Sequence, residues 1–423
     1  MRTRLIGVVC IGILGVPLLF GYEQRQEVQE KADTKKSVSR GTIETLKSFG
    51  EPIRIKGSTP VTVKTAKFTV IAQTDWKPAK PDPSFPMVAP IDIQLYITNL
   101  SDSDILLPTY KAFGIKIVDA DGKEVMAREI GKAATSTGPI LLAGGSSFSI
   151  RRRVDLRWDE KTKASELVYH DGTGLQTLFG PLAIGRYKVM YWYAARPDEP
   201  EKRKLGMTSA WVGEAVTNSV LVDVLDGTTR GLVRSKDEIR NFTEPLRVRE
   251  SKPVIVNNAK FEAVAQAEWR TGVDDKSVPI EVQLRITNQG TSDQIFPTFD
   301  TFGVRIVDAD GRKVARRGGR DLTAFTRPIL IPPGVTYALA ADSGPPTSNI
   351  DRGGVLHWDS SPARLAFSFF DGTGSAHKFS PLAAGQNKIS FWYRVRAGAR
   401  TDSRTWLGDL TTDEVSIEVF PRK

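Results

Sequence analysis

The feature that most constrains the fold of this 423-residue chain is a repeated segment. Residues 113–125 return as residues 302–314, and nine of the thirteen positions are identical. The two copies are 189 positions apart (302 minus 113). Further matches follow in the same order along most of the chain, and each change in spacing falls in a loop rich in proline, glycine or charge. We therefore expect an internal duplication whose length changes are confined to surface connections.

The repeated segment itself predicts a β-hairpin. Apolar residues alternate at Phe113, Ile115 and Ile117, as expected for a strand with one buried face. The sequence Asp-Ala-Asp-Gly follows in both copies; its glycine accepts a positive φ and its aspartates can cap a turn. A calcium loop would need a third oxygen ligand before the glycine and a distant glutamate, which the segment lacks. The pattern therefore favours a turn.

Short alternating runs, separated by turn residues, recur through both copies, which is typical of an all-β protein. We predict two tandem immunoglobulin-like β-sandwich domains from an internal duplication, following an N-terminal apolar leader. The first repeat spans residues 42–226 and the second spans residues 235–421, with a linker at 227–234. Each repeat exceeds the ~100 residues of a minimal immunoglobulin-like domain, so extra strands or long loops are expected.

The N-terminus carries the pattern of an export signal. Arg2 and Arg4 precede an uncharged apolar run at residues 5–20. We predict that residues 1–21 form a signal peptide or an uncleaved signal anchor, followed by a polar spacer at 22–41. Cys10, the single cysteine, lies in this leader, so the body can hold neither a disulfide nor a thiolate metal site. We expect a protein in the periplasm, at the cell surface or secreted, or else tethered through residues 5–20, its only expected membrane contact.

The formal net charge of +10 favours anionic partners, and export argues against nucleic acid as the physiological one. Basic residues follow the hairpin in both copies and form a candidate anion-binding patch: Lys123, Arg128, Lys132, Arg312, Arg316, Arg317 and Arg320. Three arginines at 151–153 add a cluster in the first repeat alone. Two alternatives stay open: the charges keep the protein soluble, or they prevent sheet edges from pairing with other chains.

The eight tryptophans form four pairs across the repeat, which suits a packing role. Trp192 and Trp392 differ from the rest because they share the more polar face of a predicted strand with Lys188 and Lys388. We hypothesise that this pair forms an aromatic platform for a sugar ring. The alternative is that a loop covers each ring.

Catalytic patterns are weak. The chain has three histidines, His170, His357 and His377, and none of them is matched by a histidine at the corresponding position of the other repeat. No zinc site or catalytic triad is therefore duplicated. Asp-Gly-Thr-Gly occurs at 171–174 and 371–374, but the glycine after the aspartate separates it from the aspartic-protease signature and favours a turn. Glycine-rich phosphate loops are absent. We therefore predict no enzyme activity and no cofactor; the rival is an enzyme whose site lies in one copy, around His170 or residues 342–352.

Several features together resemble the immunoglobulin-like repeats of exported bacterial proteins: the strands ending in Asn99 and Asn288, the Asp-x-Asp-Gly hairpin, the Pro-Pro-Gly at 332–334 and the Gly-x-Tyr-Lys-Val at 185–189. A more distant similarity is to the intracellular proteinase inhibitor family of bacilli, itself an immunoglobulin-like sandwich. The resemblance transfers no binding residues. We predict a non-catalytic binding or structural module of the cell envelope that contacts an anionic polymer or another envelope protein; a protease-inhibitor-like module is the alternative.

Overall fold

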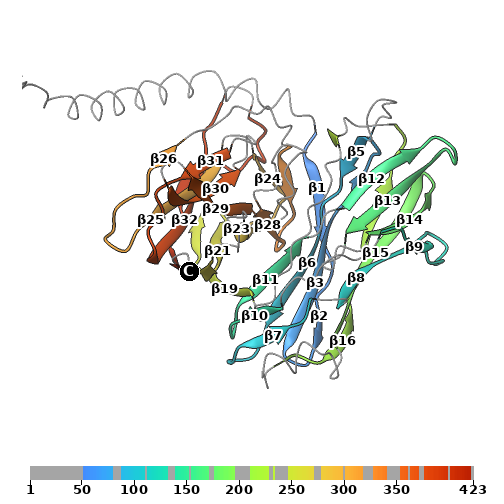
Figure 1. The fold of residues 1–423 in the computed structure, drawn as a ribbon. Helices are drawn as coiled ribbons and strands as arrows, with labels where there is room; N and C mark the ends of the chain where they lie inside the picture. Colours follow the sequence, from blue (N-terminus) through green and yellow to red (C-terminus); the bar gives the residue numbers. More distant parts are fainter. Residues whose placement is uncertain are drawn as a thin grey trace, which may run out of the picture. The chain divides into compact units, whose positions relative to one another are not determined.

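The computed structural model describes residues 51–79, 87–109, 112–131, 139–151, 154–170, 176–195, 210–227, 232–233, 246–270, 278–298, 301–317, 327–340, 353–360, 363–370, 376–398 and 401–420. These residues form strands and turns without a helix, so the predicted all-β class is confirmed (Figure 1). Within these ranges no helix has the length and apolar character needed to cross a membrane. The predicted leader and spacer lie outside the described residues.

The first repeat contributes the strands β1 (Ile53–Gly57), β2 (Val61–Val63), β3 (Ala66–Gln73), β4 (Asp75–Trp76), β5 (Met87–Pro90), β6 (Ile93–Asn99), β7 (Ile105–Leu107), β8 (Phe113–Val118), β9 (Ala127–Glu129), β10 (Ile140–Leu142), β11 (Ser147–Arg151), β12 (Val154–Asp159), β13 (Ala164–His170), β14 (Gln176–Leu182), β15 (Gly185–Ala195), β16 (Gly213–Val216) and β17 (Val220–Val224). Next comes β18 (Leu232–Val233), which pairs with β5. Part of the predicted linker is thus a short strand of the first repeat's sheet.

The second repeat contributes β19 (Leu246–Glu250), β20 (Val254–Val256), β21 (Ala259–Gln266), β22 (Glu268–Trp269), β23 (Val278–Asn288), β24 (Gln294–Phe296), β25 (Phe302–Val307), β26 (Arg316–Arg317), β27 (Ile329–Ile331), β28 (Thr336–Ala340), β29 (Gly353–Ser360), β30 (Ala363–Phe370), β31 (Ala376–Phe379), β32 (Gly385–Val395), β33 (Gly408–Thr411) and β34 (Val415–Val419).

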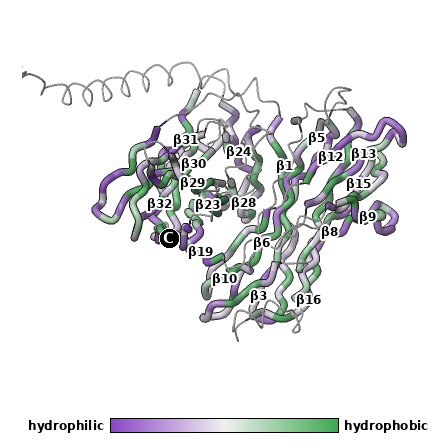
Figure 2. The backbone as a smooth tube through the Cα atoms, in the orientation of Figure 1, coloured by the Kyte–Doolittle hydropathy of each residue, from purple (hydrophilic) through white to green (hydrophobic). Residues whose placement is uncertain are grey.

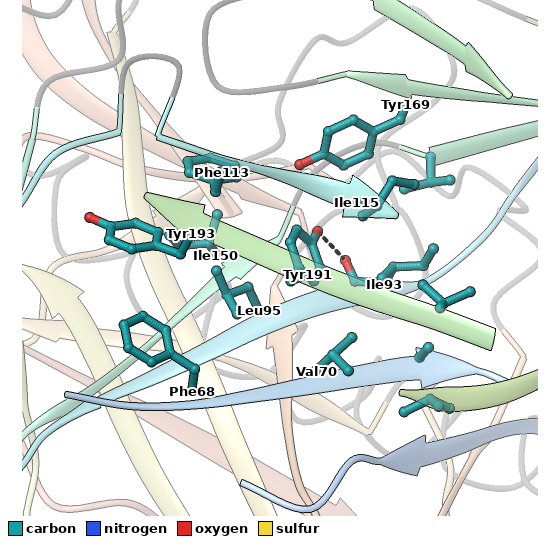
Figure 3. Packing of buried hydrophobic residues seen from close by; sticks show 14 of the residues in the cluster. Phe68, Val70, Ile93, Leu95, Phe113, Ile115, Ile150, Tyr169, Tyr191 and Tyr193 are labelled. Atoms are coloured by element: carbon teal, nitrogen blue, oxygen red, sulfur yellow. Dashed lines mark hydrogen bonds between the residues drawn. The ribbon is translucent and has the colours of Figure 1, made fainter. Parts of the chain in front are cut away.

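Apolar residues on alternating strand positions fill two core clusters. In the first, Phe68 of β3 packs against Tyr193 of β15, with ring centroids 5.4 Å apart. Figure 3 shows Val70 and Leu95 among the side chains that meet there. Figure 2 shows hydrophobic residues along the strands and hydrophilic ones at many of the connections. Packing between strand faces gives the protein its sandwich-like character.

The same pairings occur in both repeats. The β8–β15 pair sets Gly114 against Trp192, and the β25–β32 pair sets Gly303 against Trp392. The β3–β6 pair starts with Ala66 against Asn99, and the β21–β23 pair starts with Ala259 against Asn288. Matching residues of the two repeats therefore occupy matching positions in their sheets.

Two sheets continue from one repeat into the other. The first strand, β1, pairs with β3 and also, in parallel, with β27 of the second repeat. Its counterpart β19 pairs with β21 and, in parallel, with β10 of the first repeat. The strand orders are β11-β6-β3-β1-β27-β24 and β26-β31-β30-β29-β23-β21-β19-β10-β7. Each repeat thus lends its first strand to a sheet edge of the other.

The turn predicted within the repeated segment is confirmed. The Asp119 side chain accepts hydrogen bonds from the backbone N–H groups of Asp121 (3.0 Å) and Lys123 (2.8 Å), and Asp308 does the same in the second repeat. Gly122 adopts a φ of 83°. The aspartates therefore serve the backbone of the turn. The two Asp-Gly-Thr-Gly segments lie outside the described residues, between the paired strands β13 and β14 and between β30 and β31.

Candidate anion-binding surface and tryptophan faces

Two of the predicted basic residues occupy matching places on outermost strands. Arg128 lies on β9 and Arg317 on β26, and each of these strands ends its sheet. Both strands face solvent along their length, and the Arg128 side chain is 70% exposed. Arg128 reaches Glu166 only at 3.9 Å. Among the described residues no carboxylate pairs with Arg317 or with the adjacent Arg316.

The second repeat concentrates more positive charge at this edge than the first. Arg317 sits directly opposite Lys378 of β31, whereas its counterpart Arg128 sits opposite Leu178. Side chains of directly opposed residues lie on the same face of a sheet, and like charges there repel each other. We call the group formed by Arg316, Arg317 and Lys378 the basic edge.

The remaining predicted basic residues do not all add to this edge. Arg312 lies in the turn after β25, where Asp310 neutralises it at 2.9 Å. Lys123 occupies the matching turn and is exposed. Lys132 and Arg320 lie outside the described residues, as do the second and third arginines of the 151–153 cluster. Arg151, the first of that cluster, instead pairs with the buried Asp92 at 3.0 Å.

The structure places Trp192 on the outer face of the sheet that holds β15, with 36% of its surface exposed. Its ring covers Gly114 on the neighbouring strand, since a Cβ at that glycine would lie 2.7 Å from Nε1. On the other side it is paired with Val216, which is 54% exposed. Trp392 covers Gly303 in the same way and is half-buried. Both rings thus lie along the sheet and present one side outward.

Other tryptophans have packing roles. Trp76 and Trp269 are fully buried, and each indole N–H donates to a carbonyl at 2.8 Å, of Gln73 and Gln266 respectively. Trp211 and Trp406 are also buried, and the Trp406 indole N–H donates to the Val256 carbonyl at 3.0 Å. The Trp211 indole N–H has no hydrogen-bond partner among the described residues, so this ring is held by packing against Phe68 and Tyr193. A buried indole with its N–H satisfied, as in the other three, is typical of a structural tryptophan.

The three histidines occupy separate places. His170, at the end of β13, lies 3.7 Å from Asp155, and both side chains are buried. His377 is on β31 and His357 on β29. Throughout the described ranges no three histidine, cysteine or acidic side chains gather closely enough to hold a metal ion.

A set of buried polar residues between the repeats was not predicted. Gln94, Gln283 and Arg285 lie on the strand faces assigned to solvent by their alternating pattern, yet each is at most 1% exposed. Arg285 pairs with Glu250 at 2.5 Å. Burial opposes its charge, but the nearby Tyr96, Glu250 and Glu262 raise the pKa of the Arg285 guanidinium above its ordinary value. The one sequence signal was the identity of Gln94 and Gln283, polar residues retained at matching positions.

No family model matches this chain, and a search of curated proteins finds no similar sequence.

Proposed function

We propose that this chain is a non-catalytic, exported module of the cell envelope, built of two immunoglobulin-like sandwiches that arose by duplication, and that it binds an anionic polymer. The observation that carries the proposal is the basic edge, with Arg316 and Arg317 on the solvent-facing outermost strand β26 and Lys378 opposite Arg317 on the adjacent β31. The matching Arg128 in the first repeat gives a second point of contact.

Arg317 and Lys378 place two positive charges directly opposite each other on neighbouring strands. A phosphate or carboxylate polymer that lies along this edge would be attracted by both charges. Arginine suits the role because its planar group binds such anions through two parallel hydrogen bonds. A linear polyanion could also contact Arg128, and two weak contacts on one polymer increase the overall affinity.

The test is a binding measurement on the protein without residues 1–21, with a polyglycerol-phosphate polymer, a uronic-acid polysaccharide and neutral dextran. We expect binding to the two polyanions at low ionic strength. It should be lost at ~1 M salt, where the Debye length falls to ~3 Å. The double variant Arg316→Ser, Arg317→Ser should weaken binding about tenfold. The control is Arg394→Ser, because Arg394 is exposed but already paired with Asp409 at 2.6 Å.

A second candidate ligand, a neutral glycan, is supported by the outward-facing rings of Trp192 and Trp392. Binding to neutral dextran that persists in high salt and is lost in Trp192→Ala, Trp392→Ala would favour this ligand and overturn the electrostatic proposal. If the Arg316→Ser, Arg317→Ser variant binds both polyanions as tightly as the wild type does, the electrostatic proposal is also overturned.

A further inference from the structure

The contact between the two repeats obeys an approximate two-fold symmetry in its backbone hydrogen bonds. Ile53 donates its N–H to the carbonyl of Pro328 at 2.8 Å, and Leu246 donates to the carbonyl of Pro139 at 2.7 Å. Ile53 and Leu246 are repeat counterparts, and so are Pro139 and Pro328. Exchanging the two repeats therefore reproduces the contact.

Two side-chain hydrogen bonds obey the same rule. Gln94 donates its Nε2 to the carbonyl of Ala338, and its counterpart Gln283 donates to the carbonyl of Ser149. Both distances are 3.1 Å. Ser149 and Ala338 lie on β11 and β28, which are themselves counterparts. Each repeat thus uses a buried glutamine to satisfy an edge strand of the other.

The apolar packing is exchanged in the same way. Val248 and Val264 of the second repeat belong to the first repeat's core cluster. Their counterparts Ile55 and Ile71 belong to the second repeat's cluster. Such reciprocal use of matching surfaces is how two identical subunits meet in a two-fold dimer.

Tyr96 and Arg285 mark the axis of this symmetry. They are counterparts at the offset of 189 (285 minus 96), and Arg285 donates to the Tyr96 hydroxyl at 2.9 Å. Residues related by a two-fold operation touch each other only near its axis. An identical pair of repeats would therefore place two copies of one residue in contact at this point.

At the axis the two repeats differ in charge. Arg285 pairs with Glu250 at 2.5 Å and lies 3.9 Å from Glu262, both from its own repeat. The counterparts of these acids in the first repeat are Gly57 and Thr69, next to the uncharged Tyr96. Arg285 also donates to the Ser147 carbonyl of the first repeat at 3.1 Å. The second repeat thus supplies a buried cation, and the first supplies its neutral acceptors.

We propose that this surface is a pairing surface whose partner is the opposite repeat, and that the residues Tyr96, Arg285, Glu250 and Glu262 exclude pairing of two second repeats. Two second repeats would bring two Arg285 side chains, together with the four carboxylates of Glu250 and Glu262, into one buried contact without the Tyr96 acceptor. Buried like charges and donors without acceptors are strong penalties against the wrong partner. The contact therefore distinguishes the two repeats by charge even though its backbone geometry is symmetric.

The proposal can be tested in the full chain by inserting a protease site between Val233 and Leu246 and cleaving the folded protein. Cleavage removes the covalent tether, so that pairing depends on the surfaces alone. Native mass spectrometry at ~10 µM, a concentration well above a tight dissociation constant, reports which halves pair. We expect one species, a first half bound to a second half. Separation of the halves would overturn the proposal.

Two variants of the cleavable chain test the charge rule. The triple variant Glu250→Gly, Glu262→Thr, Arg285→Tyr gives the second repeat the residues of the first, and pairs of two second halves should then form. The single variant Tyr96→Arg sets two guanidinium groups on the axis and should weaken the pairing of unlike halves at least ~10-fold relative to Tyr96→Phe. If the wild type forms as many pairs of second halves as the triple variant, or if Tyr96→Arg pairs as tightly as Tyr96→Phe, the proposal is wrong.

Discussion

Trp192 lies directly over Gly114 of the adjacent strand, and the ring leaves no room for a side chain there. A Cβ on Gly114 would come within 2.7 Å of Nε1, and a Cβ on Gly303 would come equally close to Trp392. Neither glycine has a positive φ, so the backbone conformation does not require glycine at these positions. The close approach of the indole does. The Phe-Gly that opens each repeated segment is thereby explained by packing.

Gly114→Ala should lower the free energy of unfolding by about 1–3 kcal/mol, because the ring must move to admit the methyl group. Urea unfolding followed by circular dichroism measures the loss, and tryptophan fluorescence reports the displaced ring. The same glycine substitution in a Trp192→Ala background should cost much less. An equal loss of stability in both backgrounds would show that the indole is not the reason for glycine at position 114.

Asn99 and Asn288 account for the asparagine that ends a predicted strand in each copy. The Asn288 amide donates to the carbonyls of Ser292 and Ile331, both at 2.8 Å, and Asn99 donates to Ser103 and Leu142. Both side chains are fully buried. Each asparagine therefore ties its strand to the neighbouring connection.

Asn288→Ala should destabilise the protein by about 2–3 kcal/mol, because two carbonyls lose their donor inside the protein. Chemical denaturation measures this loss. The control is Asn218→Ala, since Asn218 is exposed and donates to the single carbonyl of Thr59; it should change stability by less than ~0.5 kcal/mol. Similar losses for both variants would contradict the assigned role.

The strand pattern was predictable, because a buried face imposes a period of two on the sequence. The alternation at 113–117 corresponds to β8, and the polar turn after it is present. What the pattern could not reveal is what covers the opposite face. Gln94 alternates with apolar neighbours as a solvent-facing residue would, yet it is fully buried against the second repeat. Polar residues satisfied across a contact look the same in sequence as polar residues in water.

The candidate site was predictable in composition but not in arrangement. Arg316 and Arg317 are adjacent in sequence, so their exposure on one edge could be expected. The pairing of Arg317 with Lys378 depends on strand register over 61 positions (378 minus 317), which no local pattern specifies. Arg151 was not predictable in this way. The basic run at 151–153 looks exposed in the sequence, but its first residue, Arg151, pairs with the buried Asp92.

The stability of the protein should fall in alkaline solution because of Tyr393. Burial of its hydroxyl raises the pKa of Tyr393 well above the ordinary 10.0, in spite of a hydrogen-bond contribution from Thr301 that lowers it. The unfolded chain releases this proton near pH 10 and the folded protein only at higher pH. The stabilisation is therefore complete below pH 10 and is lost as the pH rises beyond it.

Tyr393→Phe should reduce this alkaline loss, while costing about 1 kcal/mol at neutral pH through the lost hydrogen bond to Pro297, 2.6 Å long. Urea unfolding at neutral pH and at several values above pH 10 measures both effects. In the comparison variant Tyr187→Phe the alkaline loss should change less, because Tyr187 is less buried and its pKa is raised to a smaller extent. An unchanged alkaline decline in Tyr393→Phe would contradict the assignment.

The exchanged core residues predict that the two repeats unfold together. Ile71 lies on β3 of the first repeat but packs in the second repeat's cluster, whereas its neighbour Val70 packs in the first. Ile71→Ala should cost about 2–4 kcal/mol. Hydrogen exchange of the core amides should accelerate equally in β15 and β32, because loss of either cluster removes residues from the other. Val70→Ala should likewise accelerate hydrogen exchange equally in β15 and β32. Acceleration confined to one repeat, or two separate transitions in calorimetry, would show that the repeats are independent.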